Sequence, residues 1–167
     1  DQYAAVYGGF NRFDFNSDDT VNRFPIVLDK NLISELETRF VLIFSGQSRD
    51  SSEVIEDQEL AVKSKTNNAL NFLHDIKSEV HPMQLALERG DYDGISHSQN
   101  RSWLAKQGSS KVVSNNHINN IIRTAYDSGA LSAKVSGAGG GGFILFTVPF
   151  ENRSRLIRNL EENYGSV

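Results

Sequence analysis

The feature that most constrains this chain is a glycine-rich stretch, residues 134–143, which holds five of the 13 glycines. Residues 130–135 before it and the apolar residues 143–148 after it are typical of strands, so we expect a loop between two strands. Glycine has no Cβ atom, so its backbone can take positive φ and approach other groups closely. Successive N–H groups in such a loop can converge on a phosphate. We therefore interpret the stretch as a phosphate-binding loop, with a tight hairpin or bulge without a ligand as the alternative.

Three familiar glycine loops do not fit this context. The spacing Gly137-x-Gly139-x-x-Gly142 matches the dinucleotide fingerprint, but that fingerprint needs a helix directly after it, and a strand is expected here. A Walker loop ends in Gly-Lys-Ser/Thr, whereas Phe143 follows Gly142. A protein-kinase loop lies near the start of its domain, with catalytic motifs downstream, and only 25 residues follow Gly142 here.

Composition and charge narrow the class of partner. A chain of 167 residues is one domain, or one domain with a piece of another. The net charge of −4 and the lack of a basic tract make nucleic acid and anionic membranes poor candidates. No apolar run reaches the ~18 residues of a membrane span, and the absence of cysteine excludes disulfides and thiol catalysis. We expect a cytoplasmic protein with neither a membrane nor a nucleic-acid partner.

Periodicity and turn residues predict short elements in the first part of the chain. The expected elements are a helical turn at 1–7, strands at 10–15, 21–28 and 39–44, a short helix at 33–37 and a helix from about 50 to 63. Pro25 would confine its strand to a sheet edge, because proline lacks an N–H group. Asp50 with Glu53 resembles a capping box, which marks the start of a helix.

Helices dominate the expected structure of the second part. A long amphipathic helix has apolar residues on one face from 69 to 87, with a kink expected at Pro82 and an end at Gly90. A second helix is expected at 92–106, before a loop at 108–110. Further residues expected to be buried on helices are Ile95, Trp103, Leu104, Ile118, Ile121, Ile122, Ala125, Leu156, Ile157, Leu160 and Tyr164.

The order of elements predicts the fold class. From Arg39 onward it is strand, helices, strand, glycine loop, strand, helix. This order packs as an α+β fold, an antiparallel sheet with helices packed on one face. It is a ferredoxin-like layout without its last strand. The open sheet edge that results would favour pairing with a second copy, so we expect a homodimer or aggregation.

Outside the glycine loop, three side chains are candidates for anion contacts. Lys134 precedes the glycines and could neutralise a phosphate, although lysine is most often simply exposed. Ser45 and Arg49 follow the second apolar strand and precede a helix, where N–H groups and an arginine fork suit a phosphate. A capped surface turn is the alternative for both. His74 and His81 are seven residues apart, too far for shared ligation along one helix, so no metal site is assigned.

Several segments resemble motifs of a known enzyme family. Residues 134–143 resemble the third, glycine-rich motif of the GHMP small-molecule kinases, which include galactokinase and mevalonate kinase. The opening Asp1-Gln2 segment resembles the Asp-Gln segment of the sugar-kinase branch. Residues 45–50 and 102–106 are similar to a narrower group, the heptose 7-phosphate kinases and their fucose-kinase-like relatives.

The resemblance implies ATP-dependent phosphoryl transfer to a hydroxyl of a sugar phosphate, with ATP and Mg²⁺ as cofactors. It assigns to Asp1 the role of catalytic base, or of the group that orients the acceptor hydroxyl. Lys134, Arg49 and Ser45 are then the inferred anion contacts. The loop residues expected to contact phosphate and substrate are Ser136, Gly137, Ala138, Gly139, Gly140, Gly141 and Gly142.

The resemblance also divides the chain. It implies that residues 1–30 are the tail of an N-terminal ATP-binding domain and residues 31–167 most of a C-terminal ferredoxin-like domain. The family's first two motifs would lie upstream of Asp1, and Met83 is the single methionine, so we expect a truncated kinase portion that is inactive alone. One alternative is a fucose-kinase-like enzyme. Another is a non-enzymatic ferredoxin-like module that binds a small ligand.

Overall fold

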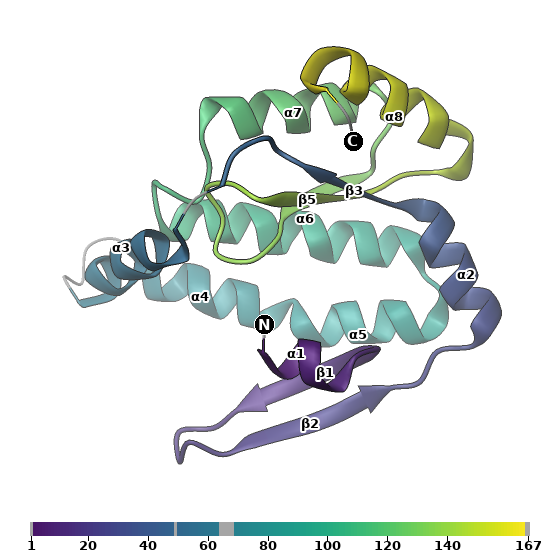
Figure 1. The fold of residues 1–167 in the computed structure, drawn as a ribbon. Coiled ribbons are helices and arrows are strands. Elements are labelled where there is room, and N and C mark those ends of the chain that lie inside the picture. Colours follow the sequence, from purple (N-terminus) through teal and green to yellow (C-terminus); the bar gives the residue numbers. More distant parts are fainter. Residues whose placement is uncertain (1, 49, 64–68, 166–167) are drawn as a thin grey trace.

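The computed structural model describes residues 2–48, 50–63 and 69–165 (Figure 1). In the N-terminal part, α1 (Gln2–Tyr7) precedes a hairpin in which β1 (Phe10–Phe15) pairs antiparallel with β2 (Val21–Ile26). Pro25 sits in β2, and both strands are edges because this sheet has two strands. The predicted helical turn and both strands are confirmed, as is the edge position of the proline. None of the helices in the described ranges has the length and hydropathy that crossing a membrane requires.

A second sheet carries the glycine stretch. Its three strands are β3 (Phe40–Phe44), β4 (Ser132–Val135) and β5 (Phe143–Thr147). The order is β3-β5-β4 and both pairings are antiparallel, which confirms the α+β class. Strand β5 lies in the centre, and four of its five residues are buried or half-buried.

Helices cover both faces of this sheet, so the prediction of helices on one face is wrong (Figure 1). On one face, α7 (Asn116–Asp127) and α8 (Phe150–Tyr164) enclose the main core. On the other lies α6 (Tyr92–Ser109), whose Gln99 amide donates to the Leu145 carbonyl at 2.8 Å and accepts from the Thr147 hydroxyl at 3.0 Å. The order of elements along the chain does not by itself determine that α6 packs on the face opposite to α7 and α8.

The expected long helix is two helices, α4 (Ala69–Ser78) and α5 (Val80–Arg89). Pro82 explains the break, because it cannot donate to the carbonyl of Ser78 and its ring crowds that group. Gly90 ends α5, as predicted, and it adopts the left-handed conformation. Both helices pack beneath α6 and complete the layer that lies farther from the sheet (Figure 1).

Two further helices flank β3, namely α2 (Lys30–Arg39) and α3 (Ser51–Lys63). The Asp50 carboxylate accepts from the Ser52 N–H at 2.9 Å and so caps α3. Leu36 of α2 forms a second core cluster with Ala86 and Ile95, against which Phe10 and other partly buried residues pack. This cluster joins the N-terminal hairpin to the helical layer.

Burial follows the sequence expectations for most apolar residues of the helices, but Ile157 and Tyr164 are half-buried. Ile95 and Trp103 are buried, and so are the four apolar residues of α7. Leu104, however, is 65% exposed, so its predicted burial is wrong. Gly108 belongs to α6 and not to a loop, because its lack of a side chain leaves room for the Phe72 ring of α4.

Candidate functional site

The glycine loop, residues 136–142, joins β4 to β5 and is fixed by two neighbouring segments. The Gly140 N–H donates to the Val113 carbonyl at 2.6 Å, and the Gly142 N–H donates to the Gln47 carbonyl at 2.8 Å. The Asn115 amide donates to the Gly140 carbonyl at 3.3 Å. The centre of the loop, residues 139–141, is buried. Part of the glycine content therefore serves close packing, as in the hairpin interpretation without a ligand.

Gly139 shows why this packing requires glycine. Its φ is +106°, a conformation that other residues rarely adopt. A Cβ atom on it would also lie 2.8 Å from the Val113 carbonyl oxygen, which is too close for contact. Both the backbone conformation and the contact with Val113 therefore require glycine at position 139.

The first half of the loop is available to a ligand. Ser136 and Gly137 are exposed and Ala138 is half-buried. In the described part of the chain, the N–H groups of Gly137, Ala138, Gly139 and Gly141 donate to no other group. Unpaired N–H groups on successive residues are the arrangement that receives an anion.

Two lysines converge at the start of this loop. The Lys134 ammonium, on β4, donates to the Ser102 hydroxyl of α6 at 3.1 Å. The Lys106 ammonium, one turn beyond Ser102 on α6, donates to the carbonyl of Gly137. Burial lowers the pKa of Lys134. Burial, with a smaller contribution from the charge of Lys134, lowers the pKa of Lys106 to about 8. Neither side chain is part of an ion pair among the described residues.

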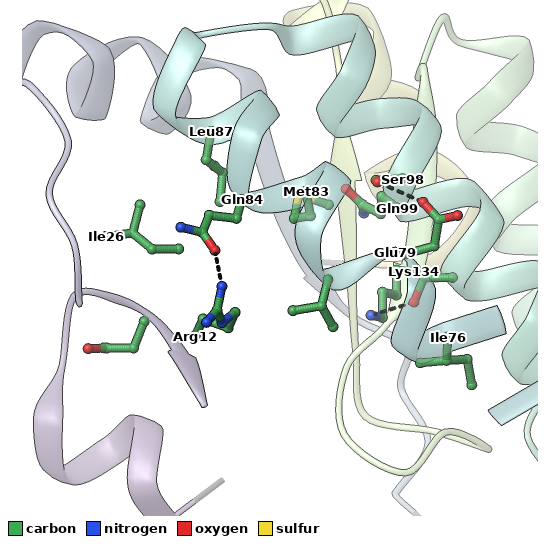
Figure 2. Close-up of a pocket in the computed structure, with 13 residues that line it drawn as sticks. Arg12, Ile26, Ile76, Glu79, Met83, Gln84, Leu87, Ser98, Gln99 and Lys134 are labelled. Carbon is green, nitrogen blue, oxygen red and sulfur yellow. Dashed lines mark hydrogen bonds between the residues drawn. The ribbon is translucent and has the colours of Figure 1, made fainter. Parts of the chain in front are cut away.

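Lys134 also lines a pocket of about 230 Å³ (Figure 2). The walls come from the β1–β2 hairpin, from α4 and α5, from α6, and from β4. They combine apolar side chains such as Ile76 and Met83 with polar ones such as Gln84 and Gln99. A pocket with apolar walls and a few converging polar groups is typical of a small-molecule site.

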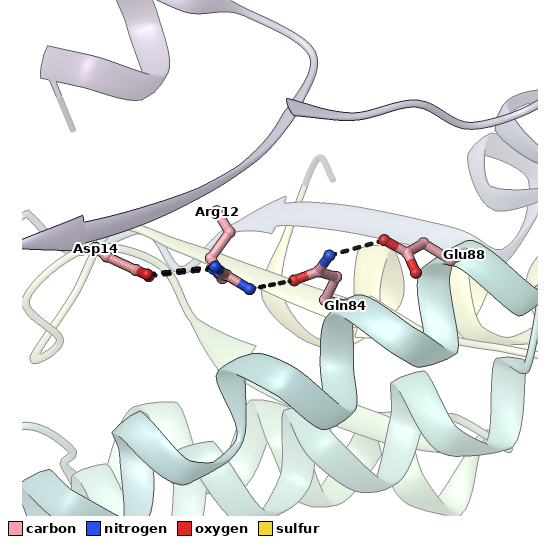
Figure 3. Close-up of polar contacts among 4 residues, drawn as sticks. All are labelled: Arg12, Asp14, Gln84 and Glu88. Atoms are coloured by element: carbon pink, nitrogen blue, oxygen red, sulfur yellow. Dashed lines mark hydrogen bonds and ion pairs between the residues drawn. The ribbon is translucent and has the colours of Figure 1, made fainter. Parts of the chain in front are cut away.

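Charges other than Lys134 in this pocket are already paired. Arg12 lies 3.1 Å from Asp14 and donates to Gln84 of α5 at 3.0 Å, and Gln84 in turn donates to Glu88 (Figure 3). The Arg12 guanidinium also lies over the Phe24 ring, 4.2 Å from its centroid.

Glu79, the pocket's carboxylate, accepts from Ser98 at 2.8 Å and from Arg101 at 3.0 Å. The pocket is therefore left with positive charge at its Lys134 end.

Of the other predicted site residues, the structure describes Ser45 but not Asp1 or Arg49. Ser45 is buried, its N–H donates to the Gly142 carbonyl at 2.8 Å, and its hydroxyl donates to the Gln47 carbonyl. His117 contacts the Ser45 carbonyl at 2.7 Å, so every polar atom of Ser45 is engaged within the protein. Asp1 and Arg49 lie outside the described residues. Ser45 therefore supports the glycine loop from a buried position, and its contact with phosphate stays a prediction.

A metal ion has no evident ligands here. Within the described ranges, no three His, Asp or Glu side chains gather as a metal site would need. The side chains that the structure describes do not by themselves fit Mg²⁺.

Sequence reasoning did not identify three residues that shape this site. Asn115 and Val113 hold the loop, and Arg12 connects the hairpin to α5. Lys106 enters the sequence interpretation only as part of the 102–106 segment that resembles the heptose 7-phosphate kinases, without a role of its own. The spacing of Ser102 and Lys106, four residues apart on one helix face, was the available signal. It does not reveal that this face meets β4.

Comparison with known sequences identifies relatives over the whole chain. Residues 83–166 match the sequence model of a family described as GHMP kinases C terminal. The D-glycero-alpha-D-manno-heptose 7-phosphate kinase of Campylobacter jejuni is 36% identical over 167 residues, which are 100% of this chain and 49% of that protein. The bifunctional fucokinase/GDP-fucose pyrophosphorylase of Arabidopsis thaliana is 26% identical over 83% of this chain and 13% of its own length. The chain thus spans about half the length of the heptose kinase.

Solved structures give the same result for the fold. Mevalonate kinase of L. major, in complex with R-mevalonate, has a TM-score of 0.80 at 21% identity, covering 97% of this chain and 47% of that one. The D-glycero-D-manno-heptose 1-phosphate kinase of Bacteroides thetaiotaomicron has a TM-score of 0.71 at 26% identity, covering 99% and 43%.

Proposed function

The chain belongs to the GHMP kinase family, and we propose that it forms the acceptor-binding half of an ATP-dependent sugar kinase. The proposed acceptor is a sugar phosphate of the heptose 7-phosphate type. The observation that carries the proposal is the glycine loop, which presents unpaired N–H groups beside the Lys106 and Lys134 ammonium groups. Unpaired N–H groups of this kind stabilise the charge of a phosphoryl group during transfer, and the ammonium groups add positive charge for a phosphate-bearing acceptor.

The proposal includes the division of the chain into two parts. Residues 31–167 would form a ferredoxin-like domain without its last strand, which the order β3-β5-β4 supports. Residues 1–30 would be the tail of the ATP-binding domain, which the separate β1–β2 sheet supports. We also propose the cytoplasm as the compartment, since ATP is the phosphoryl donor.

Each part of the site has a role in the proposed reaction. ATP supplies the phosphoryl group, and the unpaired N–H groups of Gly137 and Ala138, in the accessible first half of the loop, would hold it. Asp1 would orient the acceptor hydroxyl or accept its proton. The ATP phosphates, with groups outside the described residues, would bind Mg²⁺, because the described ones do not form a metal site.

A chimera tests the proposal. In the Campylobacter jejuni kinase, the half that this chain matches is replaced by residues 1–167. We expect the chimera to phosphorylate heptose 7-phosphate with ATP, and its Asp1→Asn variant to be slower by about 10²–10⁴-fold. This chain alone should give no turnover, because it spans about half of that enzyme. A chimera that melts cooperatively yet transfers no phosphate would contradict the proposal.

The second candidate is a kinase for a neutral sugar such as fucose. The similarity to the Arabidopsis fucokinase favours it. A panel of L-fucose, heptose and heptose 7-phosphate, given to the same chimera, separates the two candidates. We expect turnover of the phosphorylated sugar, because the pocket holds an unpaired ammonium group.

A further inference from the structure

We propose that Lys106 and Lys134 form a cationic subsite for the phosphate monoester already present on the acceptor, which makes the site selective for a sugar phosphate over a neutral sugar. The inference rests on the proposed function and deepens it, because it assigns the non-reacting phosphate of the acceptor to named residues. It also gives Lys106 a binding role.

Hydrogen bonds hold both ammonium groups where α6 meets β4 and the start of the glycine loop. Lys106 comes from α6 and Lys134 from β4, and Ser102 of α6 accepts from Lys134 at 3.1 Å. Lys106 in turn donates to the Gly137 carbonyl at the exposed end of the glycine loop. Each ammonium has three N–H donors and uses one in these contacts. Each ammonium therefore keeps two N–H donors, and the two side chains approach from different elements to bind the oxygens of one phosphate.

The positive charge of Lys106 and Lys134 has no carboxylate partner among the described residues, which favours the binding of an anion at this position. Two like charges held together in a half-buried site repel each other and lose hydration. Among the described residues, no carboxylate pairs with either lysine, whereas Arg12 and Glu79 of the adjoining pocket each have an oppositely charged partner. The lowered pKa values of both lysines are consistent with this cost, which a bound dianion would remove.

The adjoining pocket indicates which phosphate this is. Lys134 lines the pocket, which extends away from the sheet toward the β1–β2 hairpin (Figure 2). Its volume of about 230 Å³ is below the ~300 Å³ at which small-molecule sites usually begin, so it suits a monosaccharide and not a whole nucleotide. A sugar in this pocket would direct its own phosphate to the lysines. A phosphate of the nucleotide is the other source of the same chemistry.

Binding measurements on the 167-residue chain test the subsite without requiring turnover. The variants are Lys106→Met and Lys134→Met, with Lys111→Met at an exposed lysine as the matched control. Calorimetry would compare heptose 7-phosphate, heptose and the ATP analogue AMPPNP. We expect wild type to prefer the phosphorylated sugar by about tenfold or more, and each Met variant to lose about tenfold in affinity for that sugar alone. Lys134→Arg should keep most of the affinity, because it keeps the charge.

Three results would overturn the inference. These are no preference of wild type for the phosphorylated sugar, an equal loss for neutral heptose, and a loss confined to AMPPNP, which would assign the lysines to the nucleotide. Thermal melts check folding, and Lys106→Gln and Lys134→Gln replace any Met variant that does not fold. A chimera without turnover contradicts the proposed function but leaves lysine-dependent selectivity intact, so the two failures are distinguishable.

Discussion

The backbone of Gly139 lies against Val113 so closely that a Cβ atom would be 2.8 Å from the Val113 carbonyl oxygen. Gly139→Ala should therefore lower the free energy of unfolding by about 2–4 kcal/mol, from left-handed strain and overpacking together. Gly137→Ala is the matched control, because φ is +66° there but nothing lies within 4 Å of the added atom. Strain alone should make it cost about 1 kcal/mol. Urea unfolding measures both, and equal losses would contradict the role of Val113.

Stability should depend on pH through Lys106. Burial, and secondarily Lys134, lowers the pKa of Lys106 to about 8 in the folded chain, from 10.5. Between pH 8 and 10.5 the unfolded chain binds more protons at Lys106 than the folded chain does. The free energy of unfolding therefore increases as the pH rises through this range, and this gain is lost as the pH falls back toward 8. Relative to Lys106→Met, wild type should gain melting temperature between pH 7 and 10. Lys111→Met is the control for removing one exposed ammonium. A pH-independent difference between wild type and Lys106→Met would contradict the prediction.

Gly108 should tolerate no side chain while Phe72 is present. A Cβ atom on Gly108 would lie 2.5 Å from the Phe72 ring. Gly108→Ala should destabilise the fold by about 1–3 kcal/mol, despite the higher helix propensity of alanine. In the Phe72→Ala background the same change should be neutral or stabilising. A double-mutant cycle followed by urea unfolding measures the coupling, and additive effects would show that the two residues do not meet.

The Arg12–Gln84 hydrogen bond connects the hairpin to α5 across one end of the pocket (Figure 3). Arg12→Lys should cost about 1 kcal/mol, because lysine cannot keep Asp14, Gln84 and the Phe24 ring together. In the Gln84→Ala background the cost should be smaller. Thermal unfolding of the four proteins provides the measurement. Arg23→Lys, which changes another hairpin arginine that lies over an aromatic ring, is the control.

The free edge of β3 should pair with a second copy. Within the described residues β3 pairs only with β5, and its Leu42 is 54% exposed. We expect a dimer by light scattering at high concentration, and a monomer for Leu42→Lys, since charge on an edge strand opposes pairing. Leu104→Lys, at an exposed leucine of α6, should leave the dimer intact. A strictly monomeric wild type would contradict the prediction.

Local patterns determined most of the secondary structure. The apolar spacing of Ile118, Ile121, Ile122 and Ala125 predicted the buried face of α7, and all four are buried. Asn115 caps that helix as its residue type suggests, because its side chain accepts from the Ile118 N–H. The glycine loop between two strands was evident for the same reason, since strand and turn preferences act over a few residues.

Contacts between distant residues were decided by the tertiary structure. The sequence by itself determined most of the elements, the glycine loop and the family, because these depend on neighbouring residues and on a local motif. It did not determine that α6 covers the second face of the sheet, that the Phe72 ring packs against Gly108, or that Ser45 is enclosed. Lys106 and Lys134 are 28 residues apart and meet only because α6 packs on β4. Side chains from two elements come together through burial and steric fit, which no single stretch of sequence specifies.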